Sequence, residues 1–284
     1  MFGTQNLLYD TAGDAMKRFS RAEQTGFTLI ELMIALIISL ILLAGVLHIM
    51  LGNRNSLRAQ NALAGLQARA RLLNVMLDDA IAQAGYHVEP SQKLTNILKS
   101  DAAPGSAPTL ARGSYIGAAT TKQKTILRIR FQAAGGLHNC LGKKIGKTDN
   151  TVVSERVADF SLEYYISGTD KNQIKCHTYA PKDGTGYPIT RPLLNNIRAF
   201  RTRFALDTDG DGSVDHYVDS LKPRQQRQIL TLRIQALFQT RKRVLSTPIS
   251  RSFSFVNGPD IDVNDSRRGF LFFDRTVLFR NARN

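Results

Sequence analysis

An almost unbroken apolar run, from Phe27 to Leu51, is the feature that most constrains what this chain can fold into. The run has 25 residues, and a helix needs about 20 apolar residues to cross a bilayer. Glu31, however, lies five residues into it. Because a charged side chain at the centre of a spanning helix costs roughly 2.5–3.5 kcal/mol, a carboxylate at this depth requires a partner.

The residue before the run, Gly26, argues against an ordinary secretory signal. Such a signal has an apolar core of about 7–15 residues and then a small-residue cleavage site, whereas here the core is longer and the small residue precedes it. A plain membrane anchor explains the length but not Glu31. Cleavage between Gly26 and Phe27 explains both, because Phe27 would gain a positive amine one helical turn before Glu31. The carboxylate could then pair with its own amine or with that of a neighbouring copy.

The stretch "GFTLIE" at 26–31, followed by an apolar helix, resembles the type IV prepilin family and its class III signal, which prepilin peptidase reads. The resemblance implies a leader at 1–26, cleavage after Gly26 and N-methylation of Phe27. It also implies that Glu31 helps to dock subunits into a filament. A start at Met16 instead of Met1 would give a shorter, basic leader, and both starts stay open.

The charges that flank the run predict its orientation. Lys17, Arg18 and Arg21 precede it, and positive charge before a spanning segment favours a cytoplasmic N-terminus. Arg54 and Arg58 after the run give a weaker signal in the other direction. We therefore expect a single pass at 27–51 with the residues beyond it exported, which in a Gram-negative cell means the inner membrane and the periplasm. The family resemblance implies a later place in the filament at the cell surface.

The residues after the run predict an α+β fold. Segment 52–86 carries an apolar stripe with alternating spacings of four and three, which is typical of an amphipathic helix; its members are Ala59, Leu63, Leu66, Ala70, Leu73, Leu77, Ala80 and Ala84. Gly85 is a plausible stop for that helix. Four later segments alternate apolar and polar residues as half-buried antiparallel strands do; they are 125–131, 159–166, 197–206 and 229–238. Residues 90–120 are rich in Ser, Pro, Ala and Gly and predict a connector.

The later part of the chain resembles the PilW-type minor pilins. The likeness rests on "AGY" at 84–86, on two cysteines in the head, on residues 195–218 and on "FFDRTVLFRN" at 272–281. It implies a type IV pilin-like fold, in which a long N-terminal helix, half of it in the membrane, packs on an antiparallel β-sheet head at 87–284. It also implies a minor pilin that takes part in pilus assembly and priming. The pseudopilins of type II secretion have a similar plan and are the main alternative.

The two cysteines, Cys140 and Cys176, are too few to build a zinc site. If the head is exported, we expect them to form one disulfide. If it stays in the cytosol, they are two ordinary thiols. The topology therefore decides their state.

The sequence "DTDGDGSVD" at 207–215 half-matches a calcium loop of the EF-hand type. Its possible ligands, at loop positions 1, 3, 5, 7 and 9, are Asp207, Asp209, Asp211, Ser213 and Asp215. Gly212 falls where the loop must turn, but position 12 is Val218 instead of a bidentate Glu. The alternative is a plain turn between two strands, because Asp and Gly favour turns. Calcium is thus a candidate ligand, and no cofactor is required.

Composition and motifs leave little room for an enzyme. The five histidines are scattered, no catalytic motif is present, and we expect no catalytic residue. The net charge of +15 could attract DNA, anionic lipid or acidic proteins, but the basic residues are not interleaved with aromatic ones as in single-strand binders, so DNA is not the expected partner. The family resemblance implies prepilin peptidase, other minor and major pilins, the inner membrane and, as a further candidate, a tip adhesin. From another class, a calcium-dependent adhesin or DNA-uptake tip subunit stays an alternative.

Overall fold

The computed structural model describes most of the chain after the leader. The described residues are 26–89, 91–101, 107–121, 124–132, 136–143, 157–166, 168–169, 172–179, 189–256 and 258–281. The leader expected at 1–26, the alternative start at Met16 and the basic residues before the apolar run therefore lie outside them, apart from Gly26. By its internal contacts the chain divides after Gly52 into two compact units.

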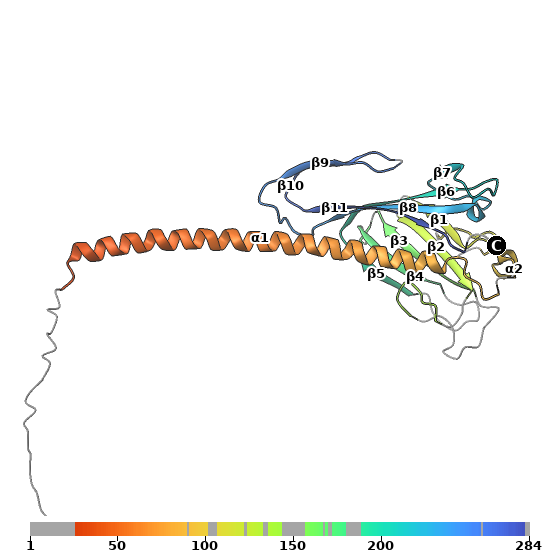
Figure 1. Cartoon of the computed structure of the whole chain (residues 1–284), viewed down its shortest axis with the longest axis horizontal. Coiled ribbons are helices and arrows are strands. Elements are labelled where there is room, and N and C mark those ends of the chain that lie inside the picture. Colours follow the sequence, from red (N-terminus) through yellow and green to blue (C-terminus); the bar gives the residue numbers. More distant parts are fainter. Residues whose placement is uncertain are drawn as a thin grey trace, which may run out of the picture. The chain divides into compact units, whose positions relative to one another are not determined.

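A single long helix, α1 (Leu29–Gln83), begins in the first unit and continues into the second (Figure 1). Its first turns carry almost only apolar side chains, and these are exposed, from Leu29 at 79% to Leu51 at 59%. Among the described residues, α1 is the one helix long and apolar enough to cross a membrane by length and composition. Because a protein rarely leaves so much apolar surface in water, this face requires lipid or other helices as its cover.

The second unit contains three antiparallel sheets. The largest has five strands, in the spatial order β1 (Ile116–Thr120), β2 (Lys124–Gln132), β3 (Val157–Tyr165), β4 (Gln173–Thr178) and β5 (Ile189–Leu194). Another has four, in the order β11 (Phe270–Leu278), β8 (Ile229–Gln239), β6 (Ile197–Leu206) and β7 (His216–Val218). The third is the hairpin of β9 (Ile249–Phe253) and β10 (Ile261–Ser266). The four strands expected from alternation correspond to β2, β3, β6 and β8, so the predicted α+β class is confirmed.

The second half of α1 shares one core with both larger sheets. Its stripe is buried from Leu66 onward, as expected, whereas Leu63 is 38% exposed. The helix ends at Gln83, and Gly85 takes a left-handed conformation with a φ of 72°. The amide of Gly85 donates to the carbonyl of Arg130 on β2 at 3.0 Å. The predicted stop at Gly85 therefore fits the structure, because this glycine turns the chain from the helix onto the sheet.

The expected connector at 90–120 contains regular structure, so that prediction is wrong in part. A short helix, α2 (Leu94–Ile97), and strand β1 lie within it. Strand β1 has the sequence "IGAAT", which lacks the alternation of a strand. It becomes a strand because it pairs antiparallel with β2 from Ile116 to Thr120. Tertiary pairing, not local preference, decides this element.

Strand β2 differs from the expectation of a single buried face. Arg128 and Arg130 were expected on the solvated side, yet they are only 1% and 2% exposed. Arg128 forms an ion pair of 2.7 Å with Asp101. Arg130 donates to the carbonyls of Lys99, Ala111 and Ser114. The segment around α2 thus covers the second face of the sheet, and the two arginines bind its backbone.

An ion pair between β8 and β11 gives the head a pH-dependent contribution to stability. Arg233 Nη2 lies 2.6 Å from Asp274 Oδ2, and the hydrogen bond from Arg233 lowers the pKa of Asp274 below its ordinary value of 3.8. A lowered native pKa stabilises the fold above the unfolded value, and this stability is lost as the pH falls through the native pKa. Both side chains are partly exposed, so we expect about 1 kcal/mol or less.

We therefore expect Asp274→Asn to flatten the loss of thermal stability that acid causes below about pH 4. Melting temperatures of the variant and the parent chain, measured from pH 3 to pH 7, test this. The variant should be slightly less stable at pH 7, and the two curves should converge in acid. Parallel curves over the whole range would contradict the assignment.

Candidate functional site

The residues expected at the processing site lie at the start of α1. Gly26 and Phe27 precede the helix without regular structure, and the side chain of Phe27 is 87% exposed. An exposed segment without regular structure is a favourable protease substrate. The structure is therefore compatible with a cut between these two residues, and it does not test the cut.

Glu31 closes a capping box with Thr28. The Thr28 amide and the Thr28 hydroxyl each lie 3.2 Å from Glu31 Oε2, and the Glu31 amide lies 3.3 Å from Thr28 Oγ1. This reciprocal pattern of Thr and Glu three residues apart satisfies amides that the first helical turn leaves without partners. Thr28 is the residue that sequence reasoning missed here, although its signal, a Thr three positions before a Glu at a helix start, was readable.

The carboxylate of Glu31 thus has a local partner before any neighbour is present. Its position at the N-terminal end of α1 is also favourable for a negative charge, because the helix dipole is positive there. The capping box explains how the chain tolerates Glu31 in isolation. The box itself does not need a negative charge, since Gln can also occupy this position.

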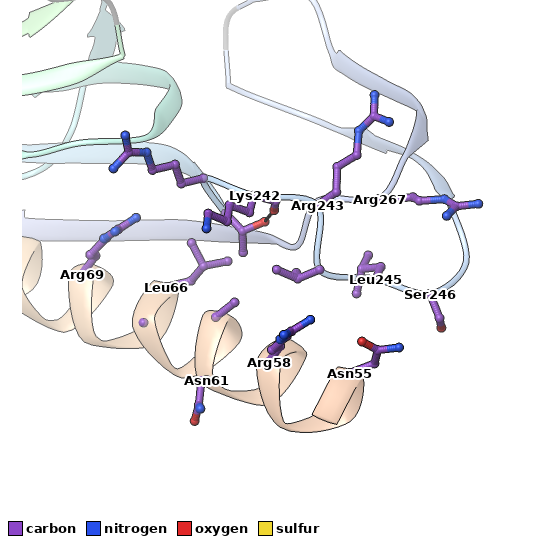
Figure 2. Close-up of a pocket in the computed structure, with 15 residues that line it drawn as sticks. Asn55, Arg58, Asn61, Leu66, Arg69, Lys242, Arg243, Leu245, Ser246 and Arg267 are labelled. Atoms are coloured by element: carbon purple, nitrogen blue, oxygen red, sulfur yellow. Dashed lines mark hydrogen bonds between the residues drawn. The ribbon is translucent and has the colours of Figure 1, made fainter. Parts of the chain in front are cut away.

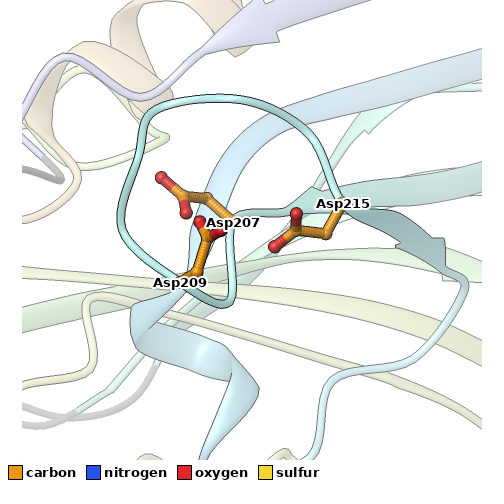
Figure 3. A group of neighbouring side chains, drawn as sticks. All are labelled: Asp207, Asp209 and Asp215. Atoms are coloured by element: carbon orange, nitrogen blue, oxygen red, sulfur yellow. The ribbon is translucent and has the colours of Figure 1, made fainter.

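The aspartate loop lies between β6 and β7. Carboxylate oxygens of Asp207, Asp209 and Asp215 come within 4.8 Å of one another, and Figure 3 shows them facing the inside of one loop. Among the described residues this is the one cluster of three or more possible metal-ligating side chains. Asp211, whose carboxylate accepts the Ser213 amide at 2.6 Å, does not belong to this cluster.

The acidic side chains of the loop also accept several hydrogen bonds from within it. Asp207 accepts the amides of Gly210 and Gly212, at 2.6 and 2.9 Å. The hydroxyl and amide of Thr208 bond to Asp215 and lower the pKa of that carboxyl. These bonds hold the loop without a metal, as the turn alternative requires, while the three close carboxylates provide oxygen ligands of the kind that Ca²⁺ prefers. Calcium binding therefore stays a prediction.

A matched pair of substitutions separates the two accounts of the loop. Asp209 and Asp211 each accept an amide two residues ahead, at 3.1 and 2.6 Å, and Asn can make the same bond. If Ca²⁺ binds the three clustered carboxylates, Asp209→Asn should weaken its affinity roughly tenfold or more, because affinity depends on ligand charge. Asp211→Asn should have a smaller effect. The measurement is the rise in melting temperature on adding Ca²⁺, and no rise in the parent chain would exclude the site.

Comparisons with known proteins connect these features to a family. The family described as "Prokaryotic N-terminal methylation motif" matches residues 21–47, which include Gly26, Phe27 and Glu31. The family described as "Type IV Pilus-assembly protein W" matches residues 163–281 in the head. The chain belongs to the type IV prepilins and is a PilW-type minor pilin. Both families consist of structural pilins, whose subunits interact with one another and are processed by prepilin peptidase.

The chain was also compared with solved structures and with curated proteins. A solved type IV-like pilin from Thermus thermophilus is similar to this minor pilin, with 13% sequence identity and a TM-score of 0.45. The match covers 76% of this chain and 97% of that one. No curated protein matches the chain.

The head of this minor pilin contains the one disulfide that its two cysteines allow. Cys140 and Cys176 are bonded, with their Cα atoms 5.8 Å apart and 36 residues apart in sequence. Cys176 lies on β4, and the bond attaches the segment around Cys140 to the five-stranded sheet. The same segment reaches α1, because the amide of His138 donates to Gln83 Oε1 at 3.2 Å. Of the two states that the sequence left open, the structure contains the disulfide.

Proposed function

We propose that this minor pilin is a structural, non-enzymatic subunit of the type IV pilus that acts in pilus assembly and priming. The observation that carries the proposal is the exposed apolar face of α1 between Leu29 and Leu51, with Glu31 near its start. Inner membrane and filament core are the two environments that would bury this face. A helix that is buried in both environments can pass from one to the other with little change in free energy, because lipid tails are about as apolar as the side chains of the neighbouring helices.

Cleavage after Gly26 would prepare Glu31 for this transfer. It would create an amine on Phe27, next to Thr28, whose amide and hydroxyl already lie 3.2 Å from the carboxylate. A carboxylate moved into an apolar bundle needs a partner, since an unpaired buried charge costs several kcal/mol. The N-terminal amine of a neighbouring pilin would supply that partner and make Glu31 a docking residue.

The proposed topology has a cytoplasmic N-terminus, one pass through the inner membrane at 27–51 and a periplasmic head. The disulfide between Cys140 and Cys176 supports it, because disulfides persist in the oxidising periplasm and are rare in the cytosol. The division into an amphipathic stalk at 52–86 and a head at 87–284 is part of the same proposal. After assembly the head would lie at the cell surface.

The proposed partners are prepilin peptidase, major pilins, other minor pilins and a tip adhesin. The head would act by presenting surfaces to these neighbours, and neither DNA binding nor a required cofactor belongs to the proposal. A calcium ion in the loop at 207–215 would stabilise that loop.

Deletion and complementation distinguish the pilus from the type II secretion pseudopilus. A deletion strain should lose most surface filaments, counted by electron microscopy after shearing, while its type II substrates still reach the medium. The full chain supplied in trans should restore the filaments. Normal filaments together with lost secretion would reject the pilus and support the pseudopilin alternative.

A further inference from the structure

A basic groove lies in the second unit, between the polar part of α1 and the loop that joins β8 to β9. It has a volume of about 920 Å³, which is in the range of sites that hold small molecules. Figure 2 shows loop residues 242–246 running along the helix, with Leu66 and Leu245 between the two. The groove therefore has an apolar floor and polar walls.

The walls of the groove are positively charged. Six of the lining residues are cationic: Arg58, Arg69, Arg241, Lys242, Arg243 and Arg267. No acidic residue lines the groove, and within the described part of the chain none of the six makes an ion pair. Like charges this close repel one another, so an anion in the groove would relieve the repulsion.

The loop is held in place by contacts that leave its cationic side chains exposed. The Thr240 hydroxyl donates to the Lys242 carbonyl at 2.8 Å, and the amides of Val244 and Leu245 donate to the Arg267 carbonyl at 2.8 and 3.0 Å. Arg268 also donates hydrogen bonds to the carbonyls of Thr240 and Arg241. A site whose backbone is already ordered loses little entropy when it binds a ligand.

The groove begins only a few residues after the end of the apolar run. Asn55 and Arg58, both in its lining, come four and seven residues after Leu51. Both residues belong to α1, and a helix rises about 1.5 Å per residue, so they come about 6 and about 11 Å after Leu51 along the helix. The polar headgroup layers add about 10–15 Å in total to a hydrocarbon core of about 30 Å. The start of the groove is thus within reach of the headgroups on the exported side.

We propose that this groove binds the phosphate headgroups of anionic phospholipid while the pilin is anchored in the membrane. Charge selects an anion, the apolar floor fits the glycerol and upper acyl carbons beside the phosphate, and the short distance from Leu51 provides the bilayer as the source. Each Lys or Arg near an anionic bilayer strengthens the attraction roughly fivefold. The groove would hold the head against the membrane before assembly. The inference rests on membrane anchoring and not on the proposed role in the pilus.

Hydrogen exchange of the full chain in lipid nanodiscs tests this binding. Discs of phosphatidylglycerol and discs of phosphatidylcholine are compared, and the readout is exchange in the peptide covering 240–248, which includes the Val244 and Leu245 amides. We expect slower exchange in phosphatidylglycerol, and less slowing at 1 M salt, where the Debye length falls to about 3 Å.

Two triple variants with the same loss of charge provide the comparison. Arg241→Gln, Lys242→Gln and Arg243→Gln together should reduce the attraction to the anionic bilayer on the order of 100-fold. Hydrogen exchange of the 240–248 peptide should then be the same in the two kinds of disc. The control carries Lys222→Gln, Arg224→Gln and Arg227→Gln, three exposed cations outside the groove lining. It should keep the difference. Equal loss in both variants would mean a diffuse charge effect and would overturn the site.

Other ligands give different results in the same assay. Equal exchange in both discs would refute lipid binding. Slowing by inorganic phosphate or by duplex DNA in phosphatidylcholine discs, without slowing by phosphatidylglycerol, would assign the groove to a soluble anion or to nucleic acid instead. Incorporation of the chain into filaments is scored separately, so the lipid site can fail while the pilus proposal stands, and the reverse.

Discussion

Glu31→Gln should remove this pilin from sheared filaments while leaving it in the inner membrane. Gln retains the capping box with Thr28, since it can occupy the same helix position, but it lacks the charge that would pair with the amine of a neighbour. Breaking a buried ion pair costs roughly 3–5 kcal/mol. We therefore expect the amount in filaments to fall on the order of 100-fold or more, because each 1.4 kcal/mol is tenfold in an equilibrium.

Thr28→Ala is the matched control for this experiment. It removes the hydroxyl that bonds to Glu31 and keeps the carboxylate. It therefore tests the contribution of helix capping while the charge of Glu31 is retained. Loss of an N-cap costs about 1 kcal/mol, and the filament content should fall far less than for Glu31→Gln. Quantitative immunoblots of sheared and membrane fractions give both values. Equal depletion by the two variants would show that the cap, and not the charge, matters for assembly.

Arg130→Met should strongly destabilise the head. The guanidinium of Arg130 makes four hydrogen bonds to the carbonyls of Lys99, Ala111 and Ser114, and its side chain is 2% exposed. Met fills similar space but has no hydrogen-bond donor. The Ala111 carbonyl keeps the Ser114 amide as a donor, whereas the carbonyls of Lys99 and Ser114 lose the guanidinium. Each buried acceptor that loses its partner costs about 1–3 kcal/mol, so we expect a loss of roughly 3–5 kcal/mol.

The corresponding fall in melting temperature is about 10 °C, at roughly 2–4 °C per kcal/mol for a domain of this size. The full chain in detergent is the sample, and circular dichroism is the measurement. Arg224→Met, at an exposed position, should shift the melting temperature by less than about 2 °C. A small shift for Arg130→Met would mean that the segment between α2 and β1 folds without this arginine.

Local patterns predicted the elements whose apolar residues recur with the period of a helix or of a strand. The helical stripe from Leu66 and the alternation in β2, β3, β6 and β8 are such patterns, and each is visible within about ten residues. Strand β1 was not predictable in this way, because "IGAAT" becomes a strand through its pairing with β2. The burial of Arg128 was missed for the same reason, since its partner Asp101 is distant in sequence and lies in a segment without a pattern.

The candidate sites also differ in whether their residues lie close together in the sequence. Gly26, Phe27 and Glu31 follow one another within six residues, so a sequence motif describes them fully. The aspartate loop is also local, yet only the folded loop separates Asp211 from the cluster of Asp207, Asp209 and Asp215. The basic groove joins residues about 180 positions apart on α1 and the β8–β9 loop. No local pattern could have placed them together.

The most direct test of the central claim is mass spectrometry of the N-terminal peptide of this chain in sheared surface filaments. A type IV minor pilin should give a peptide that begins at N-methylated Phe27. A peptide from the filaments that begins before Gly26, or absence of the chain from the filaments while it is present in the envelope, would contradict the account.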